Sequence, residues 1–271
     1  MKQAEYDRAN TQKIAAFGGI YGNILAFEAC LNDAKANRCD SLMFLGDAVG
    51  CCGHSDEALK LIRQHCDIYI AGNHEQQAAA GLTNCGCGYS SPEDERLSCL
   101  AFEYALQDLS QENQRWMGKW ADKAIVNTPA GSILLCHGSP DQTNEFLYES
   151  QLEDERLQQW LDDYDAVGLI CTHSGLPWVR QFEDGRFALN CGVVGKPDHD
   201  GDAAVHYALL DLSGNQVSIR IQRVEYDYET WTETLAEEGV DPIFIEPLKT
   251  GIWTTGISSL PPVEKQRYQF A

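Results

Sequence analysis

Four side chains of the kinds that bind metal ions each follow a short apolar segment of the sequence. The side chains are one carboxylate, one amide and two imidazoles, at Asp47, Asn73, His137 and His173. The apolar segments are Ser41–Leu45, Asp67–Ala71, Ile133–Cys136 and Ala166–Cys171. Such segments are typical of buried parallel strands, and open α/β sheets bind ligands at the carboxyl ends of their strands. The four side chains therefore indicate a metal site at one edge of a sheet.

Each of these motifs is weak or moderate alone. The aspartate of Gly46-Asp47 could be a turn or helix cap, and a lone histidine is more often a core residue than a ligand. Gly72-Asn73-His74-Glu75 after a strand is a stronger signal, and His137-Gly138-Ser139 is intermediate. The order of the motifs along the chain and their common place at strand ends carry the prediction.

The elements that must position these side chains alternate between strand and helix. A strand at Lys13–Phe17, helices over 24–34 and at Glu57–His65, and the strands at Ser41–Leu45 and Asp67–Ala71 form a β-α-β-α-β series. This series predicts a parallel sheet with right-handed crossovers. Later the hydrophobic period changes to two, which predicts antiparallel hairpins at 179–189 and 205–224.

We expect one domain in which two sheets lie face to face with helices outside. Residues 1–12 are polar and predict a loose leader, residues 13–243 form the domain, and residues 244–271 predict a tail packed on it. Residues 76–125 predict mostly helix, with Trp116 and Trp120 in the core. A loop at 84–92 interrupts them, and we treat Cys85-Gly86-Cys87 as part of this loop because its thiols are too close for a Cys-x-x-Cys clip.

The overall composition favours a soluble, cytoplasmic protein. The chain has 271 residues and a formal charge of −21, which disfavours long nucleic acids as partners. No apolar segment reaches the roughly 18 residues of a membrane span, and the N-terminus has no apolar core of a signal peptide. The 11 cysteines are odd in number and predict reduced, mostly buried thiols rather than a disulfide framework.

In this order the motifs resemble those of the calcineurin-like metallophosphoesterases, in particular the small prokaryotic branch. The likeness covers roughly residues 13–243 and includes a loop at 190–197 and the late strand segment Val224-Glu225-Tyr226-Asp227. The resemblance implies a four-layer α-β-β-α sandwich of two mixed sheets. It also implies a hydrolase with two metal ions about 3–4 Å apart.

The resemblance assigns roles residue by residue. Asp47 matches the carboxylate that bridges the two metals, and the other ligands of the second metal match Asn73, His137 and His173. His74 matches the catalytic histidine that contacts the phosphate and protonates the leaving oxygen. Asn23 matches the asparagine of the expected Gly-Asn pair and, with Tyr21, is assigned to substrate binding.

The ligands of the first metal are the departures from the family pattern. Strand one should end in Asp-x-His, but it ends in Gly19-Ile20-Tyr21, and Gly175 replaces the second histidine of the last motif. Because all three losses belong to one metal position, we infer that one metal site is retained and the other removed. A two-residue shift of the alignment would instead place Cys171 and His173 on the two histidine positions.

The retained ligands suit one divalent transition metal per chain: Mn, Fe, Zn, Co or Ni. Tyr21 could fill the emptied volume, hydrogen-bond a phosphate oxygen or ligate metal as a phenolate, with the first as the default. Thiols of Cys51, Cys52 or Cys171 could also replace lost ligands.

Two functions remain open at this point. The first is a metal-dependent phosphoesterase that hydrolyses phosphate mono- or diesters through a metal-bound water with an incomplete, one-metal site. The second is a catalytically impaired relative that binds a metal or a phosphorylated ligand as a sensor or interaction protein. The expected partner is a small phosphorylated substrate or a phosphoprotein, with no long nucleic acid and no membrane.

Overall fold

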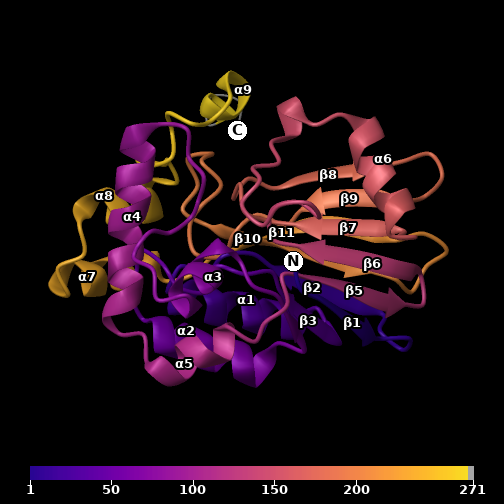
Figure 1. Cartoon of the computed structure of the whole chain (residues 1–271), viewed down its shortest axis with the longest axis horizontal. Coiled ribbons are helices and arrows are strands. Elements are labelled where there is room, and N and C mark those ends of the chain that lie inside the picture. The colour runs from indigo at the N-terminus through magenta and orange to yellow at the C-terminus, as the bar shows by residue number, and fades with distance from the viewer. Residues whose placement is uncertain (268–271) are drawn as a thin grey trace.

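Two β-sheets lie face to face in the computed structural model, which describes residues 1–267 (Figure 1). The five-stranded sheet has the order β11-β10-β2-β3-β4. Its strands are β2 (Lys13–Phe17), β3 (Ser41–Phe44), β4 (Ile68–Tyr69), β10 (Val205–Asp211) and β11 (Ser218–Val224). The strands β2, β3 and β4 are parallel and β10 is antiparallel to β2, so this sheet is mixed.

The six-stranded sheet has the order β1-β5-β6-β7-β9-β8. Its strands are β1 (Gln3–Asp7), β5 (Lys123–Thr128), β6 (Gly131–Cys136), β7 (Gly168–Cys171), β8 (Trp178–Gln181) and β9 (Phe187–Asn190). The strands β6, β7 and β9 are parallel, β5 is antiparallel to β6 and parallel to β1, and β8 is antiparallel to β9. The predicted architecture of two mixed sheets is confirmed.

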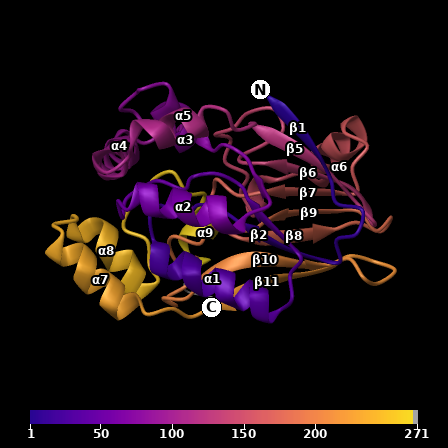
Figure 2. The same cartoon turned by 90° about the horizontal axis from the view of Figure 1, so that it is seen from below.

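Alternation along the strands divides the core into layers. In β2, Ile14 and Ala16 point into the space between the sheets, whereas Ala15 and Phe17 point to the helices outside. Burial on both faces explains why the strands read as continuous apolar segments. The helices that cover the five-stranded sheet are α1 (Ile24–Ala36) and α2 (Ser55–His65), and α6 (Asp154–Asp163) covers the six-stranded sheet (Figure 2).

The remaining helices lie around the end of the sheets where the predicted ligands are. They are α3 (Asn73–Ala79), α4 (Pro92–Gln107), α5 (Gln111–Met117), the 3-10 turn η1 (Glu149–Gln151), α7 (Tyr228–Glu237), α8 (Pro242–Thr250) and α9 (Pro262–Lys265). Apolar side chains of α4, α7 and α8 form one cluster. These three helices stand at the left of Figure 1, beyond the sheets. The helices α4, α5, α7 and α8 each begin after a Ser or Asp whose side chain accepts a backbone N–H, a strong start signal.

One prediction about secondary structure is wrong, and another, the mostly helical segment at 76–125, holds except at its last three residues. Residues 3–7 are not a loose leader but the edge strand β1, paired in parallel with β5, with Ala4 and Tyr6 against the core between the sheets. Residues 123–125 are not helical but belong to β5, whose Ala124 and Val126 face the same core. In both strands tertiary pairing overrides a short and mostly polar local sequence. Trp120 is in the core as predicted, and the half-buried Trp116 packs on it.

The segment after residue 243 is more ordered than the sequence indicates. It contains most of α8 and all of α9, and it buries Trp253 and Leu260 in a small apolar cluster with Leu176. The last part of the predicted tail, residues 268–271, lies outside the described residues. Across residues 1–267 no helix has both the length and the hydropathy needed to span a bilayer.

Candidate metal and phosphate site

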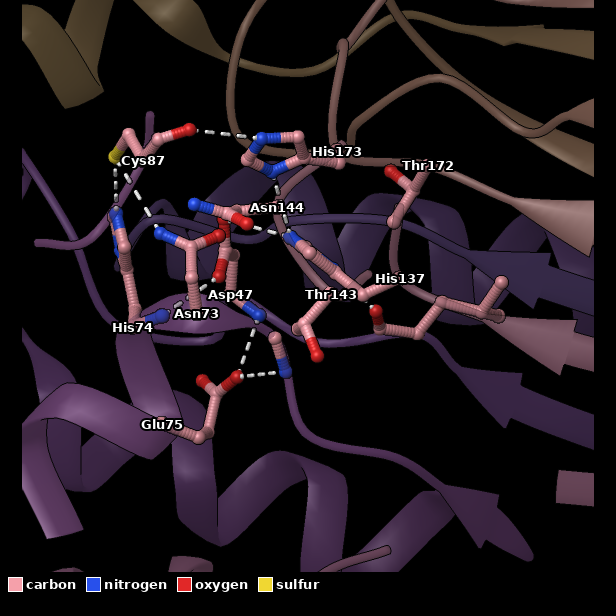
Figure 3. Close-up of polar contacts among 12 residues, drawn as sticks. Asp47, Asn73, His74, Glu75, Cys87, His137, Thr143, Asn144, Thr172 and His173 are labelled. Atoms are coloured by element: carbon pink, nitrogen blue, oxygen red, sulfur yellow. Dashed lines mark hydrogen bonds and ion pairs between the residues drawn. The ribbon is translucent and has the colours of Figure 1, made fainter. Parts of the chain in front are cut away.

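The four predicted metal ligands meet where the carboxyl ends of strands from both sheets come together. Asp47 lies three residues after β3, Asn73 is the first residue of α3, His137 directly follows β6, and His173 lies two residues after β7. Their side chains are at most 7% exposed. Figure 3 shows the side chains of Asp47, Asn73, His137 and His173 turned toward one another.

Two ligands are held in unusual backbone conformations. Asp47 has φ of 65° and His173 has φ of 33°, in the left-handed region that non-glycine residues rarely adopt. Gly72 permits the close approach of the loops, because a Cβ at this position would lie 2.3 Å from Oδ1 of Asp47. Backbone strain of this kind persists where the surrounding structure enforces it and is concentrated at functional sites.

Hydrogen bonds to carbonyl groups fix the tautomers of both imidazoles. Nδ1 of His137 lies 2.6 Å from the carbonyl oxygen of Leu45, and Nε2 of His173 lies 3.2 Å from that of Cys87. A carbonyl only accepts, so these nitrogens carry hydrogens and the other two ring nitrogens do not in the neutral rings. Those nitrogens, Nε2 of His137 and Nδ1 of His173, face each other at 3.1 Å. Two facing lone pairs require a cation between them or a proton on one ring.

The charges within this group are strongly coupled. Oδ2 of Asp47 lies 3.2 Å from Nε2 of His137. Burial raises the pKa of Asp47, but the positive charges of His137 and His74 outweigh it and hold this pKa well below its usual range. Burial and the charge on His137 lower the pKa of His173 to about 3. The group therefore holds one carboxylate between a charged and a neutral imidazole, and a divalent cation would replace the proton on His137.

Asn73 provides the remaining donor. Its Nδ2 donates to the carbonyl oxygen of Cys85 at 2.8 Å and to Sγ of Cys87 at 3.4 Å, while its Oδ1 is buried and has no partner. A buried acceptor without a partner costs about 1–3 kcal/mol, so such groups call for an ion or another ligand. The orphaned oxygen and the facing imidazoles both fit one metal ion bound by mixed N and O donors.

Glu75 holds the loop that carries Asp47. It is fully buried, and its carboxylate accepts the backbone N–H groups of Asp47, Ala48 and Gly72, each at 2.8 Å. Burial and the charge of Asp47 raise its pKa, opposed by these hydrogen bonds. The sequence analysis gave Glu75 no role, although its position as the third residue of a helix was a signal that it could bond back to the N-terminus.

His74 lies beside the predicted ligands and is joined to Asp47 by a backbone hydrogen bond. Its backbone N–H donates to Oδ1 of Asp47 at 3.2 Å, and Nδ1 lies 2.6 Å from the carbonyl oxygen of Val49. Nδ1 therefore carries a hydrogen, and Nε2 lies 3.5 Å from Sγ of Cys87 at the pocket wall. Burial lowers the pKa of His74, but the charge of Asp47 and the Cys85 thiol raise it to about 10.

Two of the three departures from the family pattern, Gly19 and Gly175, are covered by large side chains. The ring of Tyr21 lies over Gly19, because a Cβ on Gly19 would be 2.6 Å from Cζ of the tyrosine. Trp253 lies over Gly175, where a Cβ would be 3.2 Å from the indole. Burial and the charge of Asp47 raise the pKa of Tyr21 well above its usual value, which disfavours a phenolate ligand.

One cation reaches the same region. Nζ of Lys196 lies 3.4 Å from the centroid of the Trp253 ring, whose Nε1 donates to the carbonyl oxygen of Pro197 at 2.6 Å. Within residues 1–267, no carboxylate lies within ion-pair distance, 4.0 Å, of Nζ. Lys196, Tyr21, Asp47, His74 and His173 line one pocket of about 620 Å³, including its open mouth.

Asn23 does not line this pocket, so its predicted contact with substrate is not supported. It is fully buried, accepts the backbone N–H of Ala26 as the cap of α1, and donates to Gly195 and Tyr226. Each polar atom of its side chain is thus used to hold loops together. Its neighbour Tyr21 does line the pocket.

The cysteines differ in their relation to the site. Cys171 points into the core between β7 and α6 and donates to the carbonyl oxygen of Leu189, so it is not a replacement ligand. Cys51 lines the pocket, whereas Cys52 packs among apolar residues of α7 and α8. Cys85 and Cys87 lie in a loop as predicted, but the loop folds against His74. The only sign of this contact in the sequence was the presence of two thiols in a glycine-rich loop shortly after Asn73.

Comparisons with known proteins find matches over most of the chain. The family model described as calcineurin-like phosphoesterase matches residues 12–220. An uncharacterized protein of Methanocaldococcus jannaschii is 24% identical over 240 residues, which cover 83% of this chain and 92% of the relative.

Two solved structures share the fold. A metallophosphoesterase from Sphaerobacter thermophilus has a TM-score of 0.69 at 24% identity, covering 90% of this chain and all of the other. A hypothetical protein from Pyrococcus horikoshii OT3 has a TM-score of 0.71 at 17% identity, covering 89% of this chain and 99% of the other.

Proposed function

The chain belongs to the calcineurin-like phosphoesterases, and on that premise we propose that it hydrolyses phosphate mono- or diesters with one divalent metal ion per chain. Members of this family are metal-dependent hydrolases. The observation that carries the proposal is the convergence of Asp47, Asn73, His137 and His173, with the amide oxygen left without a partner and two imidazole nitrogens facing each other at 3.1 Å beside the carboxylate. A binding site for phosphate alone would have no use for these lone pairs.

These four side chains would hold the ion through Asp47, Oδ1 of Asn73, Nε2 of His137 and Nδ1 of His173. A bound divalent ion polarises a phosphoryl oxygen and lowers the pKa of a coordinated water. The donor set suits Mn, Fe, Zn, Co or Ni. Glu75 keeps Asp47 in place, and the carbonyl groups of Leu45 and Cys87 orient the two imidazoles.

His74 would donate a proton to the leaving oxygen. Its Nδ1 is anchored on Val49, so the ring is held and Nε2 is the atom that faces the pocket. With a proton on Nε2 the ring is in the state that an acid catalyst needs before each turnover.

Lys196 would supply the second positive charge that the family obtains from its first metal. It follows Gly195, which packs against the ring of Tyr21, and its ammonium lies on Trp253, which covers Gly175. The altered positions are therefore linked to this cation on two sides, Gly175 through Trp253 and Tyr21 through the adjacent Gly195. A fixed ammonium can bind a phosphoryl oxygen by a charge-assisted hydrogen bond, although it cannot activate water as a metal does.

The pocket favours a small phosphorylated molecule. Next to the charged groups it is lined by apolar and aromatic side chains, including Leu97, Ala101 and Phe244. Such a wall accepts an aryl or alkyl group on the phosphate. The net charge of −21 disfavours long nucleic acids as substrates.

The test compares Asn73→Ala with His74→Ala in the full chain. We expect wild type, loaded with Mn²⁺, to hold about one ion by mass spectrometry and to hydrolyse an aryl phosphate. Asn73→Ala should lose metal and activity together, whereas His74→Ala should keep the metal and lose about 10²–10⁴-fold in kcat. The exposed His65 provides a control, His65→Ala, which should change neither.

Other results would contradict the proposal in distinct ways. Two ions per chain would show that the first position is not lost. Binding of metal and phosphate without turnover of any phosphoester would favour the alternative of a sensor or interaction protein. Activity unchanged in His74→Ala would remove His74 as the acid.

A further inference from the structure

A second group of metal-binding atoms lies beside the proposed ligands but does not include any of them. Nε2 of His74 and the thiols of Cys85 and Cys87 lie within 4.8 Å of one another, and all three residues are buried. Neither thiol has a part in the proposed hydrolysis. Cys87 and His74 also line the pocket, so an ion at this group would be reachable from it.

The hydrogen bonds around this group favour its use as a ligand set. Because Nδ1 of His74 is anchored on the carbonyl oxygen of Val49, Nε2 presents its lone pair to the thiols whenever the ring is neutral. A histidine ligand typically donates its other ring N–H in this way. Nε2 lies 3.5 Å from Sγ of Cys87 with no carboxylate between them.

Both sulfur atoms accept hydrogen bonds from N–H groups, an arrangement that stabilises thiolates. Nδ2 of Asn73 donates to Sγ of Cys87 at 3.4 Å, and the backbone N–H of Cys87 donates to Sγ of Cys85 at 3.3 Å. The loop itself is tied to its surroundings, since Asn144 donates to the carbonyl oxygen of Gly86 at 2.8 Å. The thiols are therefore already gathered in place.

We propose that His74, Cys85 and Cys87 bind a Zn²⁺ ion that is separate from the catalytic metal and inhibits the enzyme. Two thiolates and one imidazole are the donors that zinc prefers, with the fourth position open to the pocket. Binding releases whichever protons the two cysteines and Nε2 of His74 still carry. Mn²⁺ prefers oxygen and nitrogen donors and does not compete for this site.

Inhibition follows from the shared histidine. A zinc ion on Nε2 of His74 occupies the atom that would protonate the leaving oxygen, so the acid is absent while zinc is bound. This part rests on the proposed function, whereas the zinc site itself does not. The two sites are also linked by Asn73, whose amide contacts Cys87 through Nδ2 and would hold the catalytic metal through Oδ1.

The test uses the full chain loaded with one equivalent of Mn²⁺. Zinc is added, and bound zinc, released protons and aryl-phosphate hydrolysis are followed together; Co²⁺ replaces zinc in a parallel titration to report sulfur ligation by its charge-transfer absorption. We expect wild type to bind one added ion with a sulfur-to-cobalt band and to lose activity. In Cys85→Ser/Cys87→Ser, zinc affinity should fall by more than about 100-fold, since removal of groups that merely orient ligands costs 10–100-fold.

Cys99→Ser is the matched control, because the Cys99 thiol also lies within reach of Cys85, next to Glu95. This variant should keep the cobalt band and the inhibition. A band that persists in the double serine variant, or that disappears in Cys99→Ser, would overturn the ligand set. A zinc site that is present while activity stays unchanged would refute the inhibitory role, and an inactive protein that still shows the band would separate this site from the proposed function.

Discussion

Glu75 offers the sharpest test of how the site is built. Its two carboxylate oxygens accept three backbone N–H groups, two on Oε2 and one on Oε1. Glu75→Gln keeps the shape but leaves only one oxygen. In the better orientation the amide keeps the bonds to Asp47 and Gly72 and turns its NH₂ group toward the N–H of Ala48.

The loss in free energy of unfolding caused by Glu75→Gln can be worked out from these contacts. One buried N–H loses its acceptor, which costs about 1–3 kcal/mol, and two charge-assisted bonds become neutral, each losing up to about 1 kcal/mol. We therefore expect Glu75→Gln to lower the free energy of unfolding by about 3 kcal/mol.

Urea denaturation of the two proteins measures this difference. Glu93→Gln is the control, because Glu93 is exposed and pairs only with Arg96 on the same helix. It should change stability by less than about 0.5 kcal/mol. A loss below about 1 kcal/mol in Glu75→Gln would refute the idea that this carboxylate holds the loop of Asp47.

Three further predictions concern the pocket wall. Asp94 accepts the backbone N–H groups of Gly256 and Ser259 and the hydroxyl of Ser259, so Asp94→Ala should lower stability by about 2–3 kcal/mol in urea and raise KM; an unchanged KM would contradict this. Burial lowers the pKa of Lys196 to about 8, so its ammonium is present below that pH and lost above it. Inhibition by inorganic phosphate should therefore weaken as the pH rises through about 8. In Lys196→Met, phosphate should inhibit about 10–100-fold more weakly than in wild type at pH 7, and the change near pH 8 should be absent. A change near pH 8 that survives in Lys196→Met would exclude Lys196 as its cause. Tyr21→Phe should keep its metal content by mass spectrometry, because the raised pKa of the phenol disfavours a phenolate ligand; loss of the ion would show that the tyrosine ligates it.

The sequence was most informative where a side chain adjoins a strong apolar segment. Asp47 and His137 stand within three residues of a buried strand, so the strand that can be recognised also fixes the position of the side chain. Parallel pairing then brings such ends to one edge without further information. The fold and the place of the four ligands follow from this local rule.

The rest of the pocket depends on contacts between distant parts of the chain. Lys196 is placed by Trp253, and the Cys87 carbonyl that orients His173 comes from a loop with no hydrophobic period. Likewise β1 exists because β5 offers it an edge, not because its residues favour a strand alone. Such positions carry no local signature, so only the folded structure reveals them.

The covering of Gly175 by Trp253 has a consequence for the order in which the site matures during synthesis. All four proposed metal ligands have been made once His173 is added, whereas Trp253 comes 80 residues later. Domains begin to fold while the chain is still being made, at about 5–20 residues per second. The nascent protein therefore contains all four proposed ligands several seconds before it contains the indole that seats Lys196. Metal loading and the ability to hold phosphate thus depend on different parts of the chain, and by the proposed mechanism hydrolysis needs both.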